Sequence, residues 1–370
     1  MTERVGTRMF DPTKAESIPS QSEIYYWADF VEFRCMVDPD KQFSARRLAE
    51  VAKFADDFSA TSPDAQDGDE SDIVAALLDQ ASALHTDDFD ELFDDAASSD
   101  LEDPDEPAYD DFGRAAELAD DRYRWSQEVF ALLADRQRSL GVAYPFEIDF
   151  TGLRISAPDL RPEGRAYVFY LLSSLLNHLS HQTMQRVTAE FEVFSLSVLQ
   201  IMLPSNAEVD AYGTARGRAT SRFIGSHYER LTALAAELRG VVLAHPTDFH
   251  PRDAGDNGLD LVAWLPMLDS AKGVPSFFAQ CACGKKWDGK QFEAGHERWR
   301  EFLHLSAPQT KITFIPHYFR RLGEFWYSDS DVSGVLIDRL RALRFLTSAP
   351  HVHPPAATVD AAWEFQLDVV

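Results

Sequence analysis

Two polar residues stand in apolar segments of the kind that form buried neighbouring strands. Asp260 lies in the run LDLVAWLPM, and Gln280 lies in the run PSFFAQCAC. Burying an unpaired carboxylate or amide is costly, so an isolated polar group in a core strand usually has a function. Two lysines, Lys285 and Lys286, follow the second run directly. Together these residues could hold a divalent metal ion and act on a phosphate.

The elements that would position these residues follow from the hydrophobic pattern after residue 220. A helix with an apolar face is followed by three strands, a second helix and a fourth strand. The expected ranges are 221–240 for the helix, 241–246, 259–267 and 275–283 for the strands, 290–305 for the second helix and 311–319 for the fourth strand. A final helix is expected over 332–346, followed by a Pro-rich tail with a short strand-like end.

The preceding half of the chain has a more helical pattern. Residues 22–43 begin with an aromatic, strand-like stretch, and Ser44 is a candidate N-cap for the helix that follows it. A helix is expected over 113–140, ending at Gly141, and then a strand over 145–152. Two further helical patterns in 163–203 are apolar nearly all round, which indicates burial. The expected fold class is therefore α/β, with a mainly helical N-terminal region.

This order of elements, with an acid on the second strand and Gln on the third, resembles the PD-(D/E)xK nuclease superfamily. It is most similar to the restriction-endonuclease-like branch in which Gln replaces the acid of the third strand, and the approach to Asp260 reads GDNGLD. The resemblance covers roughly residues 221–320. It implies a mixed central sheet flanked by helices and a metal-dependent endonuclease that hydrolyses DNA phosphodiester bonds. The surrounding segments resemble bacterial nucleases that defend against phage or plasmid DNA.

The same resemblance assigns roles to individual residues. It makes Asp260 and Gln280 catalytic residues and ligands of Mg²⁺ or Mn²⁺, with Glu229 as a third ligand from the preceding helix. The family pattern places a lysine two positions after Gln280, where this chain has Ala282. We therefore assign the catalytic lysine to Lys285, which a turn at Gly284 could bring back towards the site, with Lys290 as the alternative.

Each assignment has a simpler alternative. Asp260 could cap a turn, Gln280 could bond to neighbouring backbone, and Glu229 could be an ordinary solvated helix residue. Cys281 and Cys283 form a CxC that could belong to a zinc site or to a Cys–His hydrolase, although a structural zinc usually requires a second pair of ligands. The departure at Ala282 also permits a catalytically degenerate nuclease fold that acts as a DNA-binding or scaffold subunit of a defence complex.

The net charge of −26 argues against a nucleic-acid partner only until its distribution is considered. Residues 54–111 contain 21 Asp and Glu and no Lys or Arg, which leaves a net charge of −5 for the rest of the chain. Five lysines fall between 272 and 311, close in sequence to the candidate site. Such clustering suits phosphate contacts. The expected DNA-binding residues are Lys286, Lys290, Arg320 and Arg321.

The composition divides the 370 residues into five segments. The expected divisions are an ordered N-terminal segment (1–55), an acidic and largely flexible insertion (56–112), a helical region (113–220), the nuclease-like core (221–345) and a C-terminal tail (346–370). The insertion is expected to bind a partner or to restrain the nuclease.

The chain has no run of about 18 apolar residues and no secretory signal pattern, and its three cysteines do not form a disulfide framework. These features predict a cytoplasmic protein without a membrane partner. The expected partners are DNA, another protein subunit and, as a further option, a second copy of the chain.

Overall fold

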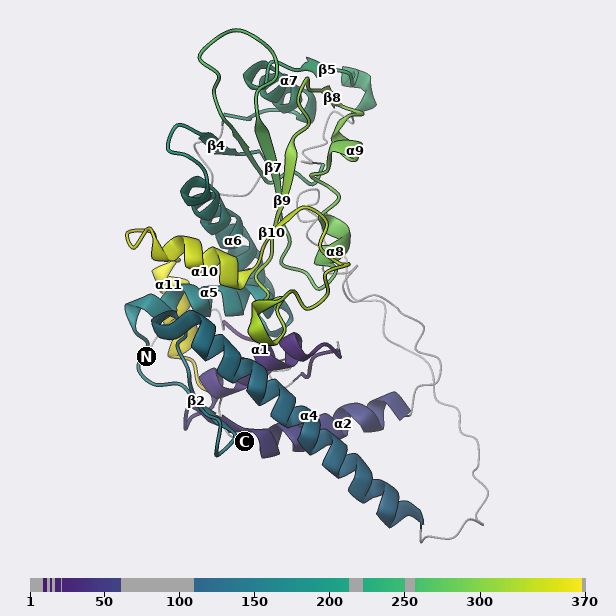
Figure 1. Cartoon of the computed structure of the whole chain (residues 1–370), viewed down its shortest axis with the longest axis vertical. Helices are drawn as coiled ribbons and strands as arrows, with labels where there is room; N and C mark the ends of the chain where they lie inside the picture. Colours follow the sequence, from purple (N-terminus) through teal and green to yellow (C-terminus); the bar gives the residue numbers. More distant parts are fainter. Residues whose placement is uncertain are drawn as a thin grey trace, which may run out of the picture.

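The central feature of the molecule is a mixed five-stranded sheet flanked by helices, which confirms the expected α/β class (Figure 1). The computed structural model describes residues 9–11, 14, 17–20, 22–60, 110–212, 222–249 and 257–367. Most of the acidic insertion, including its expected helical stretch, lies outside these residues. Within the described ranges, no helix is both long enough and apolar enough to cross a membrane.

The five strands lie in the order β10-β9-β7-β6-β4. Strand β6 is antiparallel to both of its neighbours, β4 and β7, whereas β9 is parallel to β7 and β10. The strands are β4 (Glu208–Ala211), β6 (Leu261–Trp264), β7 (Ser276–Cys281), β9 (Thr310–Phe314) and β10 (Val335–Ile337).

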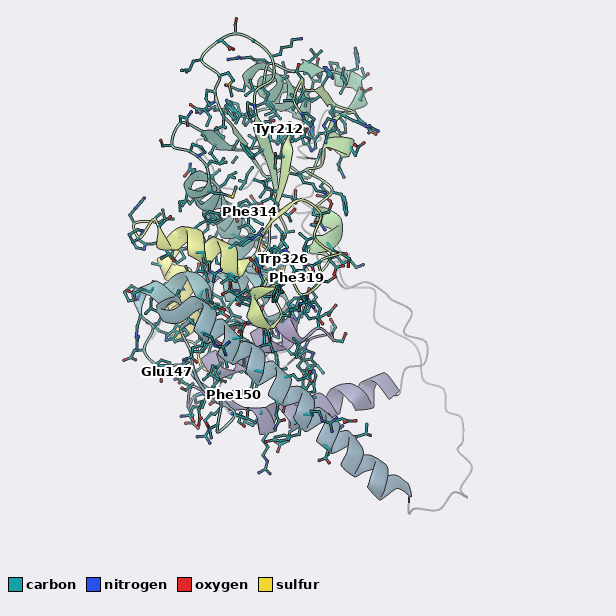
Figure 2. The ribbon with its side chains drawn as sticks, in the orientation of Figure 1. Glu147, Phe150, Tyr212, Phe314, Phe319 and Trp326 are labelled. Carbon is teal, nitrogen blue, oxygen red and sulfur yellow. The ribbon has the colours of Figure 1, made fainter. Side chains whose placement is uncertain are left out.

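Successive side chains of β6 and β7 alternate between two hydrophobic clusters, as the pleat of a strand requires. Leu261 and Ala279 join the larger cluster, to which helix α6 (His181–Met202) contributes Phe191. Val262 and Phe278 join the smaller cluster, on the side of helix α7 (His227–Glu237). Figure 2 labels residues of both clusters, among them Phe314 in the larger and Tyr212 in the smaller.

The larger cluster continues into a layer of helices and a small sheet below the central sheet (Figure 1). The helices are α1 (Ile24–Val37), α2 (Ala45–Ala60), α4 (Asp110–Leu140), α5 (Arg165–Ser174), α10 (Arg339–Thr347) and α11 (Ala356–Trp363). The strands of the small sheet are β1 (Gln42–Ser44), β2 (Glu147–Asp149) and β3 (Arg154–Ser156), in the order β1-β3-β2.

Several expected elements are confirmed. Helix α2 begins directly after Ser44, whose hydroxyl accepts a hydrogen bond from the Arg47 amide. Helix α4 ends at Leu140, and Gly141 adopts a φ of +54°, the left-handed conformation that favours glycine. The two apolar helical patterns in 163–203 correspond to α5 and α6.

The aromatic stretch that begins at residue 22 is helix α1 and not a strand. Its composition is misleading because most of the helix is buried on every side, from Tyr25 to Val37. A helix buried all round lacks the one-sided apolar pattern that identifies a surface helix, and its aromatic residues imitate strand composition.

Two expected helices are also wrong in part. Residues 290–305 do not form one helix, because α8 (Trp287–Lys290) and α9 (His296–Trp299) are single turns and are followed by β8 (Leu303–His304). Gly295 interrupts the helix because its backbone is extended. A Cβ at this position would lie 2.9 Å from the Phe292 carbonyl oxygen, so the close approach of the two backbone segments requires glycine. In 332–346 the β-branched run forms β10, and the helix starts later, with Asp338 as its N-cap.

The remaining differences concern the sheet edge and the tail. The strand expected at 241–246 is the short β5 (Val241–Val242), which pairs with β8 in a separate two-stranded sheet. The strand beside β6 at this edge of the central sheet is β4, an element that was not expected. The strand-like end of the tail is helix α11.

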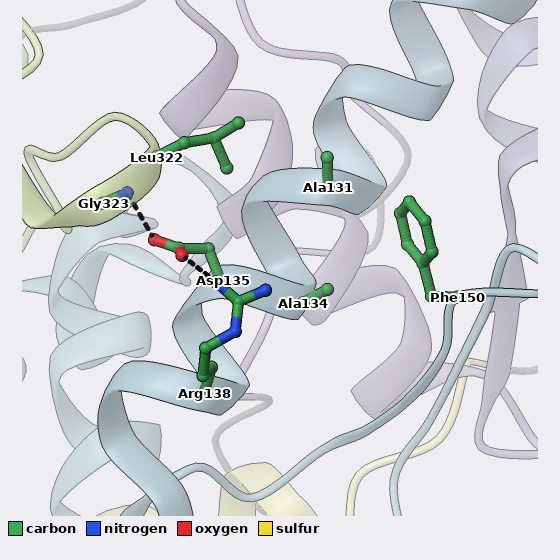
Figure 3. A pocket seen from close by; sticks show the side chains of 7 residues that line it. All are labelled: Ala131, Ala134, Asp135, Arg138, Phe150, Leu322 and Gly323. Atoms are coloured by element: carbon green, nitrogen blue, oxygen red, sulfur yellow. Dashed lines mark hydrogen bonds and ion pairs between the residues drawn. The ribbon is translucent and has the colours of Figure 1, made fainter.

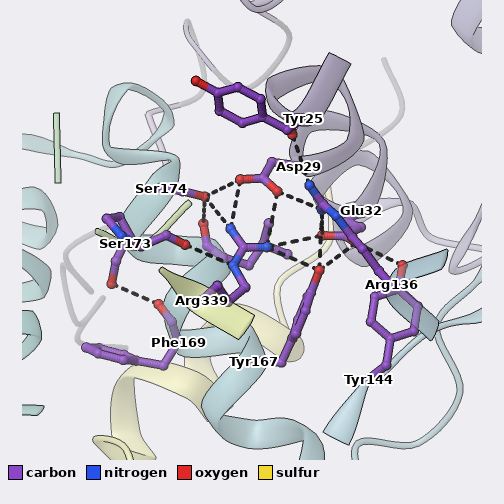
Figure 4. Close-up of polar contacts among 12 residues, drawn as sticks. Tyr25, Asp29, Glu32, Arg136, Tyr144, Tyr167, Phe169, Ser173, Ser174 and Arg339 are labelled. Carbon is purple, nitrogen blue, oxygen red and sulfur yellow. Dashed lines mark hydrogen bonds and ion pairs between the residues drawn. The ribbon is translucent and has the colours of Figure 1, made fainter. Parts of the chain in front are cut away.

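A cluster of four buried charged residues joins the helical layer to the last strand–helix unit of the sheet (Figure 4). Asp29 and Glu32 come from α1, Arg136 from α4 and Arg339 from α10, and all four are at most 1% exposed. Arg339 binds both carboxylate oxygens of Asp29, at 2.7 and 3.1 Å. Arg136 lies 2.7 Å from Asp29 Oδ1 and 3.0 Å from Glu32 Oε2. We call these four residues the buried ion cluster.

Hydroxyl groups complete the buried ion cluster. Tyr144 and Tyr167 donate to Glu32 Oε1, and Ser174 donates to Asp29 Oδ2. The arginines hold the pKa of Asp29 below its usual range although burial opposes this, whereas burial dominates at Glu32 and raises its pKa. Because the cluster is inaccessible to solvent, its role is structural.

Two buried histidines make the stability of the fold sensitive to acid. Burial lowers the pKa of His178 and of His317 to about 4. In the unfolded chain the pKa is about 6.5, so the unfolded state binds protons first as the pH falls. The free energy of unfolding is therefore expected to fall between pH 6.5 and pH 4, by up to about 3 kcal/mol for each histidine.

Urea unfolding measured at several pH values checks this expectation. His317→Phe should reduce the slope of unfolding free energy against pH in this window, and replacing the exposed His181 by Gln should leave the slope unchanged. A slope that is equally steep in His317→Phe would show that other groups control the acid sensitivity.

Candidate functional site

Asp260 and Gln280 lie side by side where β6 begins and β7 ends. The Asp260 amide donates to the Ala279 carbonyl at 3.0 Å, and the Cys281 amide donates to Asp260 Oδ2 at 2.6 Å. Asp260 thus binds the residues on both sides of Gln280. Extending the register of the β6–β7 pair also places Asp260 opposite Gln280. The structure therefore brings together the two residues that the sequence singled out.

The Gln280 side chain contains an amide oxygen that is buried without a hydrogen-bond donor. Gln280 is 6% exposed, and its Oε1 accepts no hydrogen bond within the described part of the chain. Leaving a buried acceptor unsatisfied costs about 1–3 kcal/mol. Such an atom beside the carboxylate of Asp260, itself 6% exposed, suits an oxygen-seeking cation.

The turn before Asp260 is fixed by two contacts. Asn257 and Gly258 both have positive φ angles, of +54° and +75°. The Asn257 side-chain nitrogen lies 3.1 Å from His227 Nε2, and a Cβ at Gly258 would lie 2.2 Å from Glu293 Oε2. This close packing requires glycine at 258 and sets the direction in which the chain enters Asp260.

The two candidate lysines have different surroundings. Lys285, our first assignment, points to the N-terminal segment, where its Nζ donates to Ser20 Oγ at 2.7 Å. Lys290, the alternative, ends helix α8, and its charge acts on the buried thiol of Cys283 together with that of Asp260. Lys285 is thus engaged with the N-terminal segment, and Lys290 remains the alternative assignment.

Several charged residues act on the pKa of the Cys283 thiol, three residues after Gln280. Burial raises this pKa well above its usual value, Glu192 and Asp260 raise it further, and Lys290 opposes them. Glu192 lies on α6, one of the helices that cover the sheet. The sequence reasoning did not single out Glu192, because the apolar pattern of α6 gave it no special position.

Glu229 has a different role from the one expected. It is the N3 residue of a capping box at the start of α7, and its Oε2 accepts from the Ser226 amide at 2.7 Å and from the Ser226 hydroxyl at 2.9 Å. These bonds lower its pKa. The exposed carboxylate serves as a helix cap, and we no longer assign it to the metal site.

Among the four expected DNA-binding residues, Arg320 is the one that is buried. It is 7% exposed, and its guanidinium binds both oxygens of Asp338 at 2.8 and 3.0 Å and lies over the ring of Trp326. We therefore withdraw Arg320 as a DNA contact. Lys286 and Arg321 are exposed, and Lys290 is partly exposed.

Two shallow pockets lie elsewhere and do not contain the candidate site. One, of about 230 Å³, is formed by α4 with Phe150 and Leu322, and its charged residues Asp135 and Arg138 bind each other at 2.9 Å (Figure 3). The other, of about 320 Å³, is lined by Arg222, which forms ion pairs with Glu208 and Asp210. In both pockets these charged groups are engaged with one another.

No family model, curated protein or solved structure matches this chain. The resemblance to the nuclease superfamily therefore depends on the residues and the strand arrangement alone. Across the described ranges, no three His, Cys, Asp or Glu side chains gather closely enough to hold a metal ion. A cation here would need the amide oxygen of Gln280 and bound water in addition to carboxylate.

Proposed function

We propose that this protein is a metal-dependent DNA endonuclease whose site is centred on Asp260 and Gln280. The observation that carries the proposal is the buried, unsatisfied Oε1 of Gln280 beside the Asp260 carboxylate, on adjacent strands. The strand arrangement supports a restriction-endonuclease-like core, because the antiparallel pair β6–β7 is followed by β9, which is parallel to β7. The resemblance extends the proposal to bacterial defence against phage or plasmid DNA, together with another protein subunit or a second copy.

The donor set fits a hard cation such as Mg²⁺ or Mn²⁺. Carboxylate and amide oxygens are the ligands these ions prefer, and Mg²⁺ commonly keeps several waters and uses only one or two carboxylates. Asp260 and Gln280 would hold the ion together with bound water. When bound, the ion would lower the pKa of a coordinated water and polarise the phosphate oxygens.

The residues of the chain would then have separate tasks. Asp260 provides the negative charge of the site and, through its bonds to β7, fixes the position of Gln280. Lys290, at the end of α8, would supply the cation that stabilises the negative charge developing on the phosphate during hydrolysis. Lys286 and Arg321, both exposed, would contact the DNA backbone.

A cleavage assay tests this function. The wild-type protein and Asp260→Ala are incubated with single- and double-stranded DNA in Mg²⁺, in Mn²⁺ and in EDTA. Cleavage that requires the metal and is lost in Asp260→Ala supports the proposal. Equal cleavage by the two proteins would show that the site is assigned wrongly.

One alternative has support of its own. Lysine is absent at 282, where the buried Ala282 stands, and Lys285 binds Ser20. These features favour a catalytically degenerate nuclease fold that binds DNA or acts as a scaffold in a defence complex. DNA binding without any metal-dependent cleavage would select this alternative.

Gln280→Glu is expected to tighten Mn²⁺ binding by about tenfold at pH 8, because it adds a negative charge to the site. The same charge next to Asp260 should lower the melting temperature of the metal-free protein. Added Mn²⁺ should consequently raise the melting temperature more in the variant than in the wild type. Calorimetric titration and thermal unfolding measure the two effects, and an unchanged affinity would argue against Gln280 as a ligand.

A further inference from the structure

An aromatic ring is exposed to solvent in the segment that packs against the turn before Asp260. Phe292 is 57% exposed. The next residue, Glu293, packs against Gly258 in the turn that leads to Asp260. The ring therefore belongs to a segment whose neighbouring residue is held against this turn.

A lysine accompanies the ring. Lys311 Nζ lies 4.3 Å from the centre of the Phe292 ring and donates to Ser333 Oγ at 2.9 Å. The ammonium group is thus held in place over the aromatic surface. Because the ring remains more than half exposed with Lys311 over it, a large part of its surface is open to a ligand.

An exposed aromatic ring with cations beside it is the combination that binds single-stranded nucleic acid. The ring stacks on an unpaired base, and the cations contact the phosphates on either side. The bases of an intact duplex are stacked on each other, so their faces are not available to a side chain on the protein surface. Lys290 and Lys311 would contact the backbone on the two sides of such a base.

We propose that Phe292 stacks on an exposed base of single-stranded DNA next to Asp260, so that the substrate of the site is single-stranded or locally unpaired DNA. This inference rests on the proposed function and adds the substrate class to it. One aromatic contact of this kind changes affinity for a single strand by about 5- to 100-fold.

The experiment measures binding of fluorescent oligonucleotides in the Asp260→Ala background, in the absence of cleavage. Phe292→Ala should weaken binding of a 12-nucleotide single strand by about 5- to 100-fold and change binding of a blunt duplex by less than about twofold. Phe292→Trp should retain single-strand binding because it keeps an aromatic face. Leu268→Ala is the matched control, since Leu268 is fully exposed in the loop at the other end of β6 and should affect neither ligand.

The outcomes separate this inference from the proposed function. If Phe292→Ala binds the single strand as the background protein does, or loses both ligands equally, the inference is overturned and the nuclease proposal stands. If the wild-type protein neither binds nor cleaves DNA in any form, the proposed function is overturned, and the inference with it.

Discussion

The rate of Mg²⁺-dependent DNA cleavage is expected to fall by at least about 10³-fold when Asp260 is replaced by asparagine. Asparagine preserves the size of the side chain and an oxygen that can accept from the Cys281 amide, so β6 and β7 should remain paired. The change removes the one negative charge that the Asp260–Gln280 pair offers a cation. A loss of several kcal/mol of transition-state stabilisation corresponds to this decrease in rate.

Glu229→Gln is the matched control for this variant. It also replaces a carboxylate by an amide, but at a position where the carboxylate caps α7. Cleavage by Glu229→Gln should stay within about twofold of the wild type, while the start of α7 is weakened because the charged cap is lost. If the cleavage rate falls more in Glu229→Gln than in Asp260→Asn, Glu229 is a metal ligand, as first expected from the sequence.

Arg339→Met is expected to lower the free energy of unfolding by about 3–5 kcal/mol. Arg339 is completely buried, and it binds Asp29 through two nitrogens and also Tyr167 and Ser174. Methionine would fill part of the volume but would leave Asp29 and Glu32 to share Arg136. Urea unfolding followed by circular dichroism measures the change.

Arg344→Met provides the comparison for Arg339→Met because it lies on the same helix, α10, and also removes an ion pair. Arg344 is half exposed and binds the partly exposed Glu324, so its loss should cost less than about 1 kcal/mol. Adding Asp29→Leu to Arg339→Met should recover part of the stability, since it removes the carboxylate left unpaired. Similar losses for Arg339→Met and Arg344→Met would mean that the buried ion cluster contributes little.

The sequence was most informative where a polar residue interrupted an apolar strand. Asp260 and Gln280 could be paired in advance because strand alternation and the order of the elements restrict where they lie. The lysine and the third acid of the proposed site could not be placed in this way. Glu229 caps α7 and Lys285 binds Ser20, and neither contact is encoded in strand periodicity.

The local sequence pattern was least informative for elements that are buried on nearly all sides. Helix α1 has almost no amphipathic pattern because it is enclosed on nearly all sides, so its aromatic residues suggested a strand. Within it, Asp29 and Glu32 are three residues apart in an otherwise apolar run, a signal that could have indicated buried, paired acids. Their arginine partners could not have been named, since Arg339 is 310 residues away from Asp29 in the chain.

This separation in sequence constrains how the protein can evolve. A mutation that neutralises Asp29 leaves Arg339 with an uncompensated charge, so a single substitution is harmful where a matched pair of substitutions is tolerated. The two codons are therefore under joint selection although 310 residues separate the two positions. Recombination between them with a diverged copy would separate compatible partners.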